Sequence, residues 1–330
     1  MQTKEVFTPD SIRNLANSFQ QSRVLLTAIE LEIFTVLDKH MMHSDNVAKV
    51  INCNKRAVNR LMNALVALGF LRKVHGKYYN AETSAKYLVK GKPDYMGNLH
   101  HTNHLWDSWS MLTESVKSGG SVFQKTNSSK EGWRENFIAA MHYRAQREAK
   151  IISLMLDFSN VNKMLDIGGG SGAFTYEFLS TNENVKGAIL DLPEIIPITK
   201  KYAAECELSN RVEFIEGDYL DCSFGKGYDL ILLSAIVHIN SFEQNKGLIT
   251  KCAESLNPGG QIIIRDFIMN EDRTGPLGGA LFSLNMLVGT ECGDTYTENE
   301  MRDWFVNAGI NKVIRKDTSF GSNILIGIKN

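Results

Sequence analysis

The sequence is poor in the patterns that mark secreted, zinc-binding and membrane proteins. Its five cysteines are scattered along 330 residues and none forms a CxxC pair, which argues against a disulfide framework and a zinc ribbon and is typical of a reducing compartment. No uninterrupted apolar run approaches the roughly 20 residues that a membrane span needs. The first ten residues, MQTKEVFTPD, lack the apolar stretch of a secretory signal. We therefore expect a soluble, cytoplasmic protein with no membrane partner.

A strong charge imbalance is also missing. The formal net charge is −1 and 22% of the residues are charged, so the composition as a whole does not indicate a nucleic-acid or acidic-polymer partner. The charges are unevenly spread, because residues 1–90 hold 13 Lys/Arg against 7 Asp/Glu. This basic excess is compatible with DNA contact or with a solvated face.

Residues 1–95 have the pattern of a winged helix-turn-helix module. Apolar residues recur at helical spacing over 10–39. A Ser44 cap then opens a short helix to Ile51, and an Asn54 cap opens a longer helix that ends at Gly69. Residues 71–79 predict a small hairpin that turns at Gly76. The longer helix carries one apolar stripe, formed by Val58, Leu61, Met62, Leu65 and Val66.

Residues 96–330 predict an α/β domain. A helical connector over 96–160 contains a polar loop at 118–132. Short strands then alternate with helical segments, which is typical of a parallel sheet with helices on both faces. The predicted strands are 163–167, 185–190, 211–216, 228–233 and 261–267, and a terminal hairpin is predicted from 311–314 and 323–328. The expected fold is a Rossmann-like doubly wound sheet with a terminal β-hairpin, preceded by an α-helical winged-helix-like domain.

A glycine turn follows the first predicted strand of this domain. Residues 164–172, MLDIGGGSG, join a buried strand to a helix through Gly168, Gly170 and further glycines. The backbone of such a turn can approach a ligand with no Cβ in the way, and N–H groups at the helix N-terminus suit a carboxylate. Asp166 and this turn are therefore a candidate cofactor site.

Acidic residues follow the next two strands. Ligands bind at the carboxyl ends of the strands in a doubly wound sheet, and Asp191 and Asp218 both stand at such ends. A carboxylate is a double acceptor that suits the two hydroxyls of a ribose, which we assign to Asp191. Asp218 can accept from an exocyclic adenine amine, with Tyr219 beside it to pack on the ring. His238 lies just past the fourth strand, where we expect the reacting atoms.

Two other interpretations of these residues stay open. Residues 168–173 also fit the GxGxxA fingerprint of an NAD site, with Asp191 at a suitable distance. Against NAD, the fingerprint lies in the middle of the chain and the turn at 217–219 has no role in a dinucleotide site. In the other interpretation the glycines form only a tight turn and the aspartates only cap helices, which four correctly spaced strand-end features make improbable.

These residues resemble a known family. The shared motifs are LDIGGGSG at 165–172, LDLPE at 190–194, EGDY at 216–219, IVH at 236–238, NPGG at 257–260, EDRTGPL at 271–277 and SLNMLV at 283–288. Over nearly the whole chain they are similar to the class I S-adenosylmethionine-dependent small-molecule O-methyltransferases of the acetylserotonin, caffeate and isoflavone type. The resemblance implies S-adenosylmethionine as cofactor, S-adenosylhomocysteine as product, no metal, and a homodimer formed through the N-terminal domain, which closes the partner's acceptor pocket.

The resemblance also implies a catalytic base. His238 matches the residue that takes the proton from an acceptor hydroxyl as the oxygen attacks the methyl group. Asp266 stands where the family has one of two glutamates that orient this base, and Thr295 where it has the other. Ile239 replaces the acidic residue that usually follows the base. Either Glu291 or Asp294 is a possible substitute for the second glutamate, and transfer to carbon or nitrogen stays open.

The remaining site residues come from the same resemblance. Leu192 and Ser234 join the residues that bind the cofactor, and the connector over 96–160 becomes a substrate cap. The candidates for the acceptor pocket are Met141, Trp106, Asn285 and Met286. A thioether suits contact with an aromatic acceptor, although plain helix packing explains Met141 equally well.

A metal site and a DNA-binding function are the competing interpretations. No carboxylate stands at ligand spacing from the cluster of His100, His101 and His104, so we expect a surface or pocket role there. The winged helix favours a DNA-binding regulator through six basic residues, Lys55, Arg56, Arg60, Arg72, Lys73 and Lys77. Against it, the apolar stripe of that helix is committed to packing. We expect a methyltransferase acting on a hydroxyl of a small aromatic acceptor, with no nucleic-acid partner.

Overall fold

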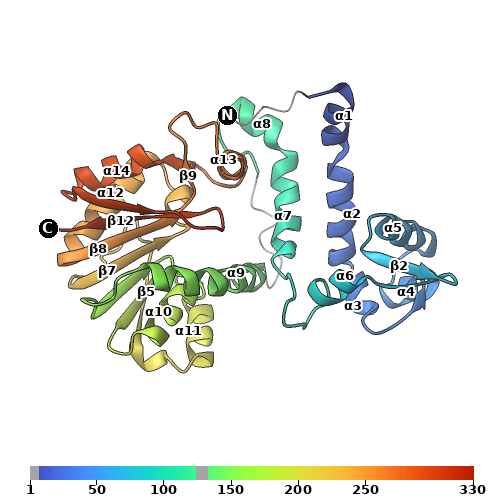
Figure 1. Ribbon diagram of the computed structural model, residues 1–330, viewed down its shortest axis with the longest axis horizontal. Helices are drawn as coiled ribbons and strands as arrows, with labels where there is room; N and C mark the ends of the chain where they lie inside the picture. Colours follow the sequence, from blue (N-terminus) through green and yellow to red (C-terminus); the bar gives the residue numbers. More distant parts are fainter. Residues whose placement is uncertain (1–6, 124–132) are drawn as a thin grey trace. The chain divides into compact units, whose positions relative to one another are not determined.

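The structure, a computed structural model, describes residues 7–123 and 133–330. The chain divides into two compact units, Met1–Leu105 and Trp106–Asn330 (Figure 1). In the part of the chain that is described, no helix has both the length and the apolar character that crossing a bilayer requires. Most of the loop predicted over 118–132 lies outside the described residues.

The N-terminal unit packs helices against a small antiparallel sheet of order β1-β3-β2. Its elements are α1 (Pro9–Asn17), α2 (Phe19–Glu30), α3 (Ile33–Val36), β1 (Met42–His43), α4 (Ser44–Val50), α5 (Lys55–Ala67), β2 (Leu71–Val74), β3 (Lys77–Asn80), α6 (Glu82–Tyr87) and the first part of α7 (Leu99–Ser110). The side chain of Asn54 accepts from the Ala57 N–H (3.2 Å) and so begins α5. The helices and the hairpin follow one another in the order expected from the sequence.

The helical segment over 10–39 is broken into three helices. After α2 ends, Glu32 takes a left-handed φ of 50°, which turns the chain before α3. The turn brings new side chains onto the core that the stripe of α5 also enters. The buried residues of this core include Ile33, Phe34, Leu37, Val58, Met62 and Leu65. Periodicity marked these positions as apolar, but it did not mark the break, because tertiary packing selects the left-handed residue.

The C-terminal unit is built on a seven-stranded sheet of order β11-β12-β8-β7-β4-β5-β6 (Figure 1). Its strands are β4 (Lys163–Ile167), β5 (Lys186–Asp191), β6 (Val212–Glu216), β7 (Tyr228–Ser234), β8 (Leu256–Asp266), β11 (Lys312–Lys316) and β12 (Asn323–Ile328). Strands β4 to β8 are parallel, whereas β12 pairs antiparallel with β8 and β11. The predicted doubly wound sheet with a terminal hairpin is confirmed.

Helices cover both faces of this sheet, because alternate side chains of each strand point to opposite faces. On one face, α12 (Phe242–Ser255) and α14 (Glu298–Asn307) pack on Leu165 and Ile167 of β4. On the other face, α9 (Trp133–Met155), α10 (Ala173–Thr181) and α11 (Ile196–Glu205) pack on a cluster that includes Met164. The unit also contains α8 (Leu112–Ser118), α13 (Leu277–Gly289), β9 (Ile268–Met269), β10 (Tyr296–Thr297) and the short 3₁₀ helices η2 (Ser209–Arg211) and η3 (Val237–Ile239).

The order of the strands reverses at β4, which lies between β5 and β7. In such sheets the ligand crevice lies outside the carboxyl ends of the strands at this reversal. Ile167 of β4 pairs with Leu233 of β7, which pairs with Ile264 of β8. The residues that follow these three, Gly168, Ser234 and Arg265, therefore stand at one level at the mouth of the crevice.

Candidate active site

The glycine turn has backbone conformations and close contacts that residues with side chains could not adopt. Gly168, Gly170 and Gly172 have φ values of 65°, 57° and 80°. A Cβ on Gly168 would overlap the side chain of Ile236, and one on Gly172 would overlap the ring of Tyr176. Gly172 is also the N-cap residue that precedes α10. The turn therefore presents backbone, and not side chains, to the crevice, as the sequence predicts.

Asp166 lies behind this turn. Its side chain is buried at the carboxyl end of β4, and Thr175 Oγ1 donates to its Oδ2 (2.8 Å). A Cβ on Gly169 would lie 3.0 Å from the Asp166 carboxyl. Burial raises the pKa of Asp166 to about 7, an effect that the Thr175 hydrogen bond opposes. The Asp166 carboxyl thus packs against the backbone of the turn at Gly169, and its pKa lies near neutral pH.

Asp191 ties the end of β5 to the turn. Its Oδ2 accepts from the Gly170 N–H (2.8 Å) and its Oδ1 from the Leu192 N–H (2.7 Å). Burial raises the pKa of Asp191, and the two backbone donors counteract this. Each carboxylate oxygen has a further lone pair. Asp191 is therefore an oriented acceptor at the strand end, with the exposed Leu192 beside it.

Asp218 and Tyr219 follow β6 in the neighbouring turn. Asp218 is exposed, and its Oδ1 accepts from the Leu220 N–H (2.8 Å). The Tyr219 hydroxyl donates to Asn240 Oδ1 (2.9 Å). Burial raises the pKa of Tyr219 to about 12, so the hydroxyl stays protonated. The two residues lie at the same edge of the sheet as Asp191, because Asp191 pairs with Glu216 at the end of β6.

His238 and Asp266 form the other part of the site. His238 lies in η3, just after β7, and its Nδ1 is 2.8 Å and 2.9 Å from the two carboxylate oxygens of Asp266 at the end of β8. A carboxylate oxygen accepts, so Nδ1 is the donor in these contacts and Nε2 takes no part in them. Asp266 is buried and also accepts from the Phe267 N–H (2.8 Å). The rings of His238 and Phe282 also form a T-shaped contact, with their centroids 4.8 Å apart.

The other carboxylates considered for His238 point elsewhere. Asp294 contacts His238 through its backbone N–H, which donates to the His238 carbonyl (3.0 Å), while its carboxylate accepts from Arg273 Nη1 (3.0 Å). Thr295 is buried, and its hydroxyl is 3.4 Å from the Gly279 carbonyl. Ile239 is exposed. The carboxylate found on the His238 ring is that of Asp266.

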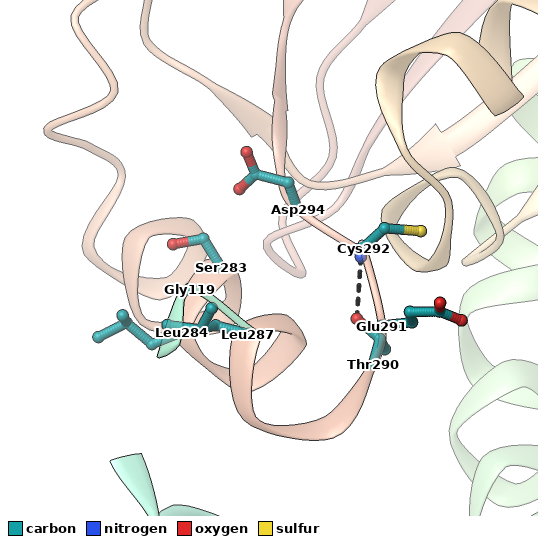
Figure 2. Close-up of a pocket in the computed structure, with 9 residues that line it drawn as sticks. Gly119, Ser283, Leu284, Leu287, Thr290, Glu291, Cys292 and Asp294 are labelled. Atoms are coloured by element: carbon teal, nitrogen blue, oxygen red, sulfur yellow. Dashed lines mark hydrogen bonds between the residues drawn. The ribbon is translucent and has the colours of Figure 1, made fainter. Parts of the chain in front are cut away.

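A cavity of about 320 Å³ lies between α13 and the segment that follows it (Figure 2). Its lining residues are Gly119, Ser283, Leu284, Leu287, Thr290, Glu291, Cys292, Gly293 and Asp294. The Gly293 N–H donates to Thr290 Oγ1 (2.9 Å), which holds the segment in its turn. A Cβ on Gly293 would overlap the His238 carbonyl. The wall of the cavity at Gly293 therefore packs directly against the backbone of His238.

The predicted acceptor residues do not line this cavity. Asn285 and Met286 lie on α13 between lining residues; Asn285 Oδ1 accepts from Trp109 Nε1 (2.8 Å), and Met286 is buried. Trp106 and Met141 are half-buried on α7 and α9. A role for these four in binding an acceptor stays a prediction.

Comparison with known proteins adds an independent result to this geometry. A model of the O-methyltransferase domain matches residues 109–311, and a model of the O-methyltransferase dimerisation domain matches residues 13–90. The chain belongs to the O-methyltransferase family. The predicted family, its methyl-transfer activity and S-adenosylmethionine as its cofactor are thereby confirmed, and the NAD interpretation is set aside.

Individual relatives extend over the whole chain. The 3-hydroxy-5-methyl-1-naphthoate 3-O-methyltransferase of Streptomyces sahachiroi is 29% identical, over 97% of this chain and 95% of its own length. Acetylserotonin O-methyltransferase of Gallus gallus is 28% identical, over 99% of both chains. The crystal structure of human N-acetylserotonin methyltransferase in complex with S-adenosylmethionine superposes with a TM-score of 0.86, at 26% identity and with full coverage of both chains.

The residues present fit the adenosyl cofactor of this family. The side-chain-free glycine turn leaves room for close approach, and the Asp191 carboxylate is held with lone pairs to spare. Among the described residues, no group of three His, Cys, Asp or Glu side chains is placed to hold a metal ion. In the histidine cluster of the N-terminal unit, His100 Nε2 lies 2.8 Å from the Tyr95 hydroxyl.

Several residues around the site were missed by sequence reasoning. His142 of α9 lies above the glycine turn, with Nδ1 2.8 Å from Ser171 Oγ and its ring stacked on Tyr202 at 4.1 Å between centroids. Arg265 of β8 donates to Ser234 Oγ (3.3 Å) and pairs with Glu148 of α9. One signal was available for Arg265, since a charged residue stood inside the apolar strand 261–267. Nothing local in the sequence pointed to His142.

Gly168→Ala is expected to destabilise the protein more than Gly225→Ala. Both glycines have a left-handed φ (65° and 77°), so each alanine carries a backbone cost of about 1–2 kcal/mol. Position 225 has open space around the new methyl group, whereas position 168 has Ile236. We expect Gly168→Ala to lose a further ~1–3 kcal/mol of unfolding free energy, measured by urea denaturation. Equal losses in the two variants would show that contact with Ile236 does not constrain the turn.

Asp166→Asn is expected to flatten the pH dependence of stability. The pKa of Asp166 is about 7 in the folded protein against an ordinary value of 3.8, so between these values the folded state holds a proton that the unfolded state has released. Stability contributed by this group therefore falls as pH rises through this window. Relative to the wild type, the asparagine variant should gain on the order of 1–3 kcal/mol between pH 4 and pH 8 in denaturant titrations. The exposed Asp303→Asn serves as control, and parallel pH profiles for wild type and Asp166→Asn would contradict the expectation.

Proposed function

We propose that this protein transfers the methyl group of S-adenosylmethionine to a hydroxyl of a small aromatic acceptor, with His238 as the general base. The observation that carries this proposal is the pair of contacts from His238 Nδ1 to both oxygens of Asp266. They leave Nε2 as a proton acceptor on a ring that is held in place. The named relatives that act on a naphthoate and on acetylserotonin support an aromatic acceptor.

The chemistry requires a base of moderate strength. A phenolic hydroxyl has a pKa of about 10 and is a poor nucleophile while it is protonated. His238 Nε2, within hydrogen-bond reach, takes that proton as the oxygen attacks, and the Asp266 carboxylate stabilises the resulting imidazolium. Phe282 contacts the His238 ring, and Phe267 packs on Phe282 with centroids 4.5 Å apart and the rings tilted by 31°. These half-buried rings are apolar neighbours suited to an aromatic acceptor.

The cofactor residues divide by the atoms that they offer. The bound S-adenosylmethionine supplies an activated methyl group on its sulfonium. Asp191 would accept from the ribose hydroxyls, and Asp218 from the adenine amine, with Leu192 and Tyr219 against the ring. Gly168 and Gly170 would let the amino-acid end approach the backbone closely, while their N–H groups donate to the Leu190 carbonyl (2.8 Å) and to Asp191 Oδ2. The protein's part is to align this group with the acceptor oxygen near His238.

The N-terminal unit supports assembly into a homodimer. The dimerisation-domain match covers residues 13–90 of this unit. Helices α1 and α2 expose large apolar side chains, with Ile12 56%, Leu15 64% and Phe19 52% exposed. Exposed apolar side chains gathered on successive helices are typical of an association surface. A second copy of this chain is the partner that we propose for them.

Asp191→Ala is expected to abolish tight cofactor binding. Removing the carboxylate leaves the ribose hydroxyls without acceptors, and a hydrogen bond to a charged group is worth ~1.5–3 kcal/mol, so affinity for S-adenosylhomocysteine should fall at least ~10-fold. Isothermal titration calorimetry of the full-length protein measures this, with the exposed Glu183→Ala as control. Unchanged affinity in Asp191→Ala would remove Asp191 from the site, and failure of the wild type to bind S-adenosylhomocysteine would refute the proposed function.

His238→Gln is expected to lose the chemical step and keep the cofactor. Without the imidazole, kcat on a reactive phenol or naphthol should fall by about 10²–10⁴-fold. The affinity for S-adenosylhomocysteine should stay within about twofold of the wild type, because the binding residues are intact. Methyl transfer is followed by mass spectrometry of the product, which also shows whether oxygen, nitrogen or carbon is methylated. The exposed His40→Gln is the control, and a His238→Gln variant with wild-type kcat would exclude a base role.

A further inference from the structure

The proposed mechanism does not use a buried group of charges on the opposite face of β8 from Asp266. Arg265 precedes Asp266, and strand alternation sends their side chains to opposite faces of the sheet. Asp266 meets His238, whereas Arg265 meets α9 and α10. The Arg265 side chain is only 8% exposed. A buried charge needs partners, and their identity indicates what the group can bind.

The partners of Arg265 leave its Nε without an acceptor, and the two arginines carry one positive charge more than the Glu148 carboxylate balances. Its Nη2 donates to Glu148 Oε2, and its Nη1 is 3.3 Å from Ser234 Oγ. Arg144 Nε also donates to Glu148, through Oε1 (2.8 Å). Two guanidinium groups thus share one carboxylate. Within the described residues, Arg265 Nε is buried and has no hydrogen-bond partner.

The aromatic surroundings do not supply an acceptor for this N–H. The Arg265 guanidinium carbon lies 5.3 Å from the centroid of Phe174 and 5.9 Å from that of Phe320. These rings favour a cation electrostatically but offer no oxygen. Burial lowers the pKa of Arg265 to about 10, which leaves it charged at neutral pH. Glu148 supplies an anionic oxygen to Nη2, but the Nε N–H has no acceptor among the described residues.

The position of Arg265 relates this group to the cofactor crevice. Arg265 pairs with Ser234 across β7 and β8, at the level of Gly168. Phe174, under its guanidinium, is the second residue of α10, directly after the glycine turn. Helix α9, which carries Glu148, also packs over the turn, since a Cβ on Gly170 would lie 3.7 Å from Ile138. The backbone of Arg265 therefore stands at the mouth of the crevice beside the end of β7, and its side chain lies against the two helices that border the turn, α9 and α10.

The carboxyl edge of the sheet also indicates where each end of the cofactor would lie. With the ribose at Asp191 and the methyl group near His238, the amino-acid end must lie across the end of β4, towards β7. Gly168, Ser234 and Arg265 stand there. The amino-acid end is the part of the cofactor that carries a carboxylate, and a guanidinium is the side chain that binds a carboxylate most specifically.

We propose that Arg265 binds the carboxylate of the methionine moiety of the cofactor, with Ser234 beside it and Glu148 balancing half of the local positive charge. This inference rests on the proposed function. A carboxylate of the acceptor is the other possible source of the same chemistry, and the two ligands chosen below distinguish the sources.

The test compares two adenosyl ligands on the same full-length protein. S-adenosylhomocysteine has the amino-acid end, whereas 5′-methylthioadenosine lacks it. Their Kd values are measured by isothermal titration for the wild type, Arg265→Met and Glu148→Gln. The Kd of 5′-methylthioadenosine divided by the Kd of S-adenosylhomocysteine isolates the contribution of the amino-acid end. A general loosening of the adenosine site raises both Kd values and leaves this ratio unchanged.

We expect Arg265→Met to reduce this ratio by about 30-fold or more, through loss of affinity for S-adenosylhomocysteine alone. Glu148→Gln should keep or increase the ratio, because it removes the competing carboxylate and leaves the guanidinium charged. An ion pair that serves only to hold α9 on the sheet predicts instead that both variants behave alike. If Arg265→Met does not fold, Arg265→Lys replaces it, and loss of the planar fork should still lower the ratio several-fold.

The outcomes separate this inference from the proposed function. A wild-type protein that binds neither ligand refutes the proposed function and this inference with it. A wild type that binds S-adenosylhomocysteine, together with an unchanged ratio in Arg265→Met, refutes only this inference and leaves the acceptor as the source of any anion at Arg265. Equal reduction of the ratio by Arg265→Met and Glu148→Gln also refutes it, in favour of a structural ion pair.

Discussion

The parallel pairing of β7 with β8 is the constraint on which the site depends. Because Ser234 pairs with Arg265, the two strands end together, and the next residues of each chain segment enter the crevice. The pleat then sends Asp266 to one face, where it meets His238, and Arg265 to the other, where it meets Glu148. A shift of one residue in this register would exchange the two side chains and remove both contacts. The proposed base and the proposed carboxylate site are therefore positioned by the same ladder of hydrogen bonds.

Sequence reasoning located what local patterns encode. The strands of a parallel sheet are buried on both faces and read as short apolar runs, so β4 to β7 were found within a residue or two of their bounds. The turn at Gly168 to Gly172 and the aspartates at the strand ends were found because their roles need particular residue types. Asp266 as the partner of His238 came only from the resemblance to the family. Spacing alone cannot show that two residues 28 positions apart lie 2.8 Å from each other.

The unpredicted features all depend on contacts between distant segments. Arg265 and Glu148 are 117 residues apart, and His142 meets Ser171 from another element, so no periodicity connects them. The left-handed Glu32 that breaks the predicted N-terminal helix follows the same rule, since non-glycine residues adopt this φ only where tertiary packing compensates. These are the places where burial has decided between local alternatives. Two of the three border the crevice.

A single buried carboxylate on His238 has a chemical consequence for the acceptor. The Asp266 contacts orient the ring, so the proposed base does not depend on an acid at 239 or 295 for its geometry. A histidine base has a pKa far below that of an aliphatic alcohol and within about four units of a phenol. The proton transfer that we propose for Nε2 is therefore matched to an acidic, aromatic hydroxyl. Phe282 contacts the His238 ring and Phe267 packs on Phe282, so the apolar surroundings of the proposed base also suit the flat ring of a phenolic acceptor.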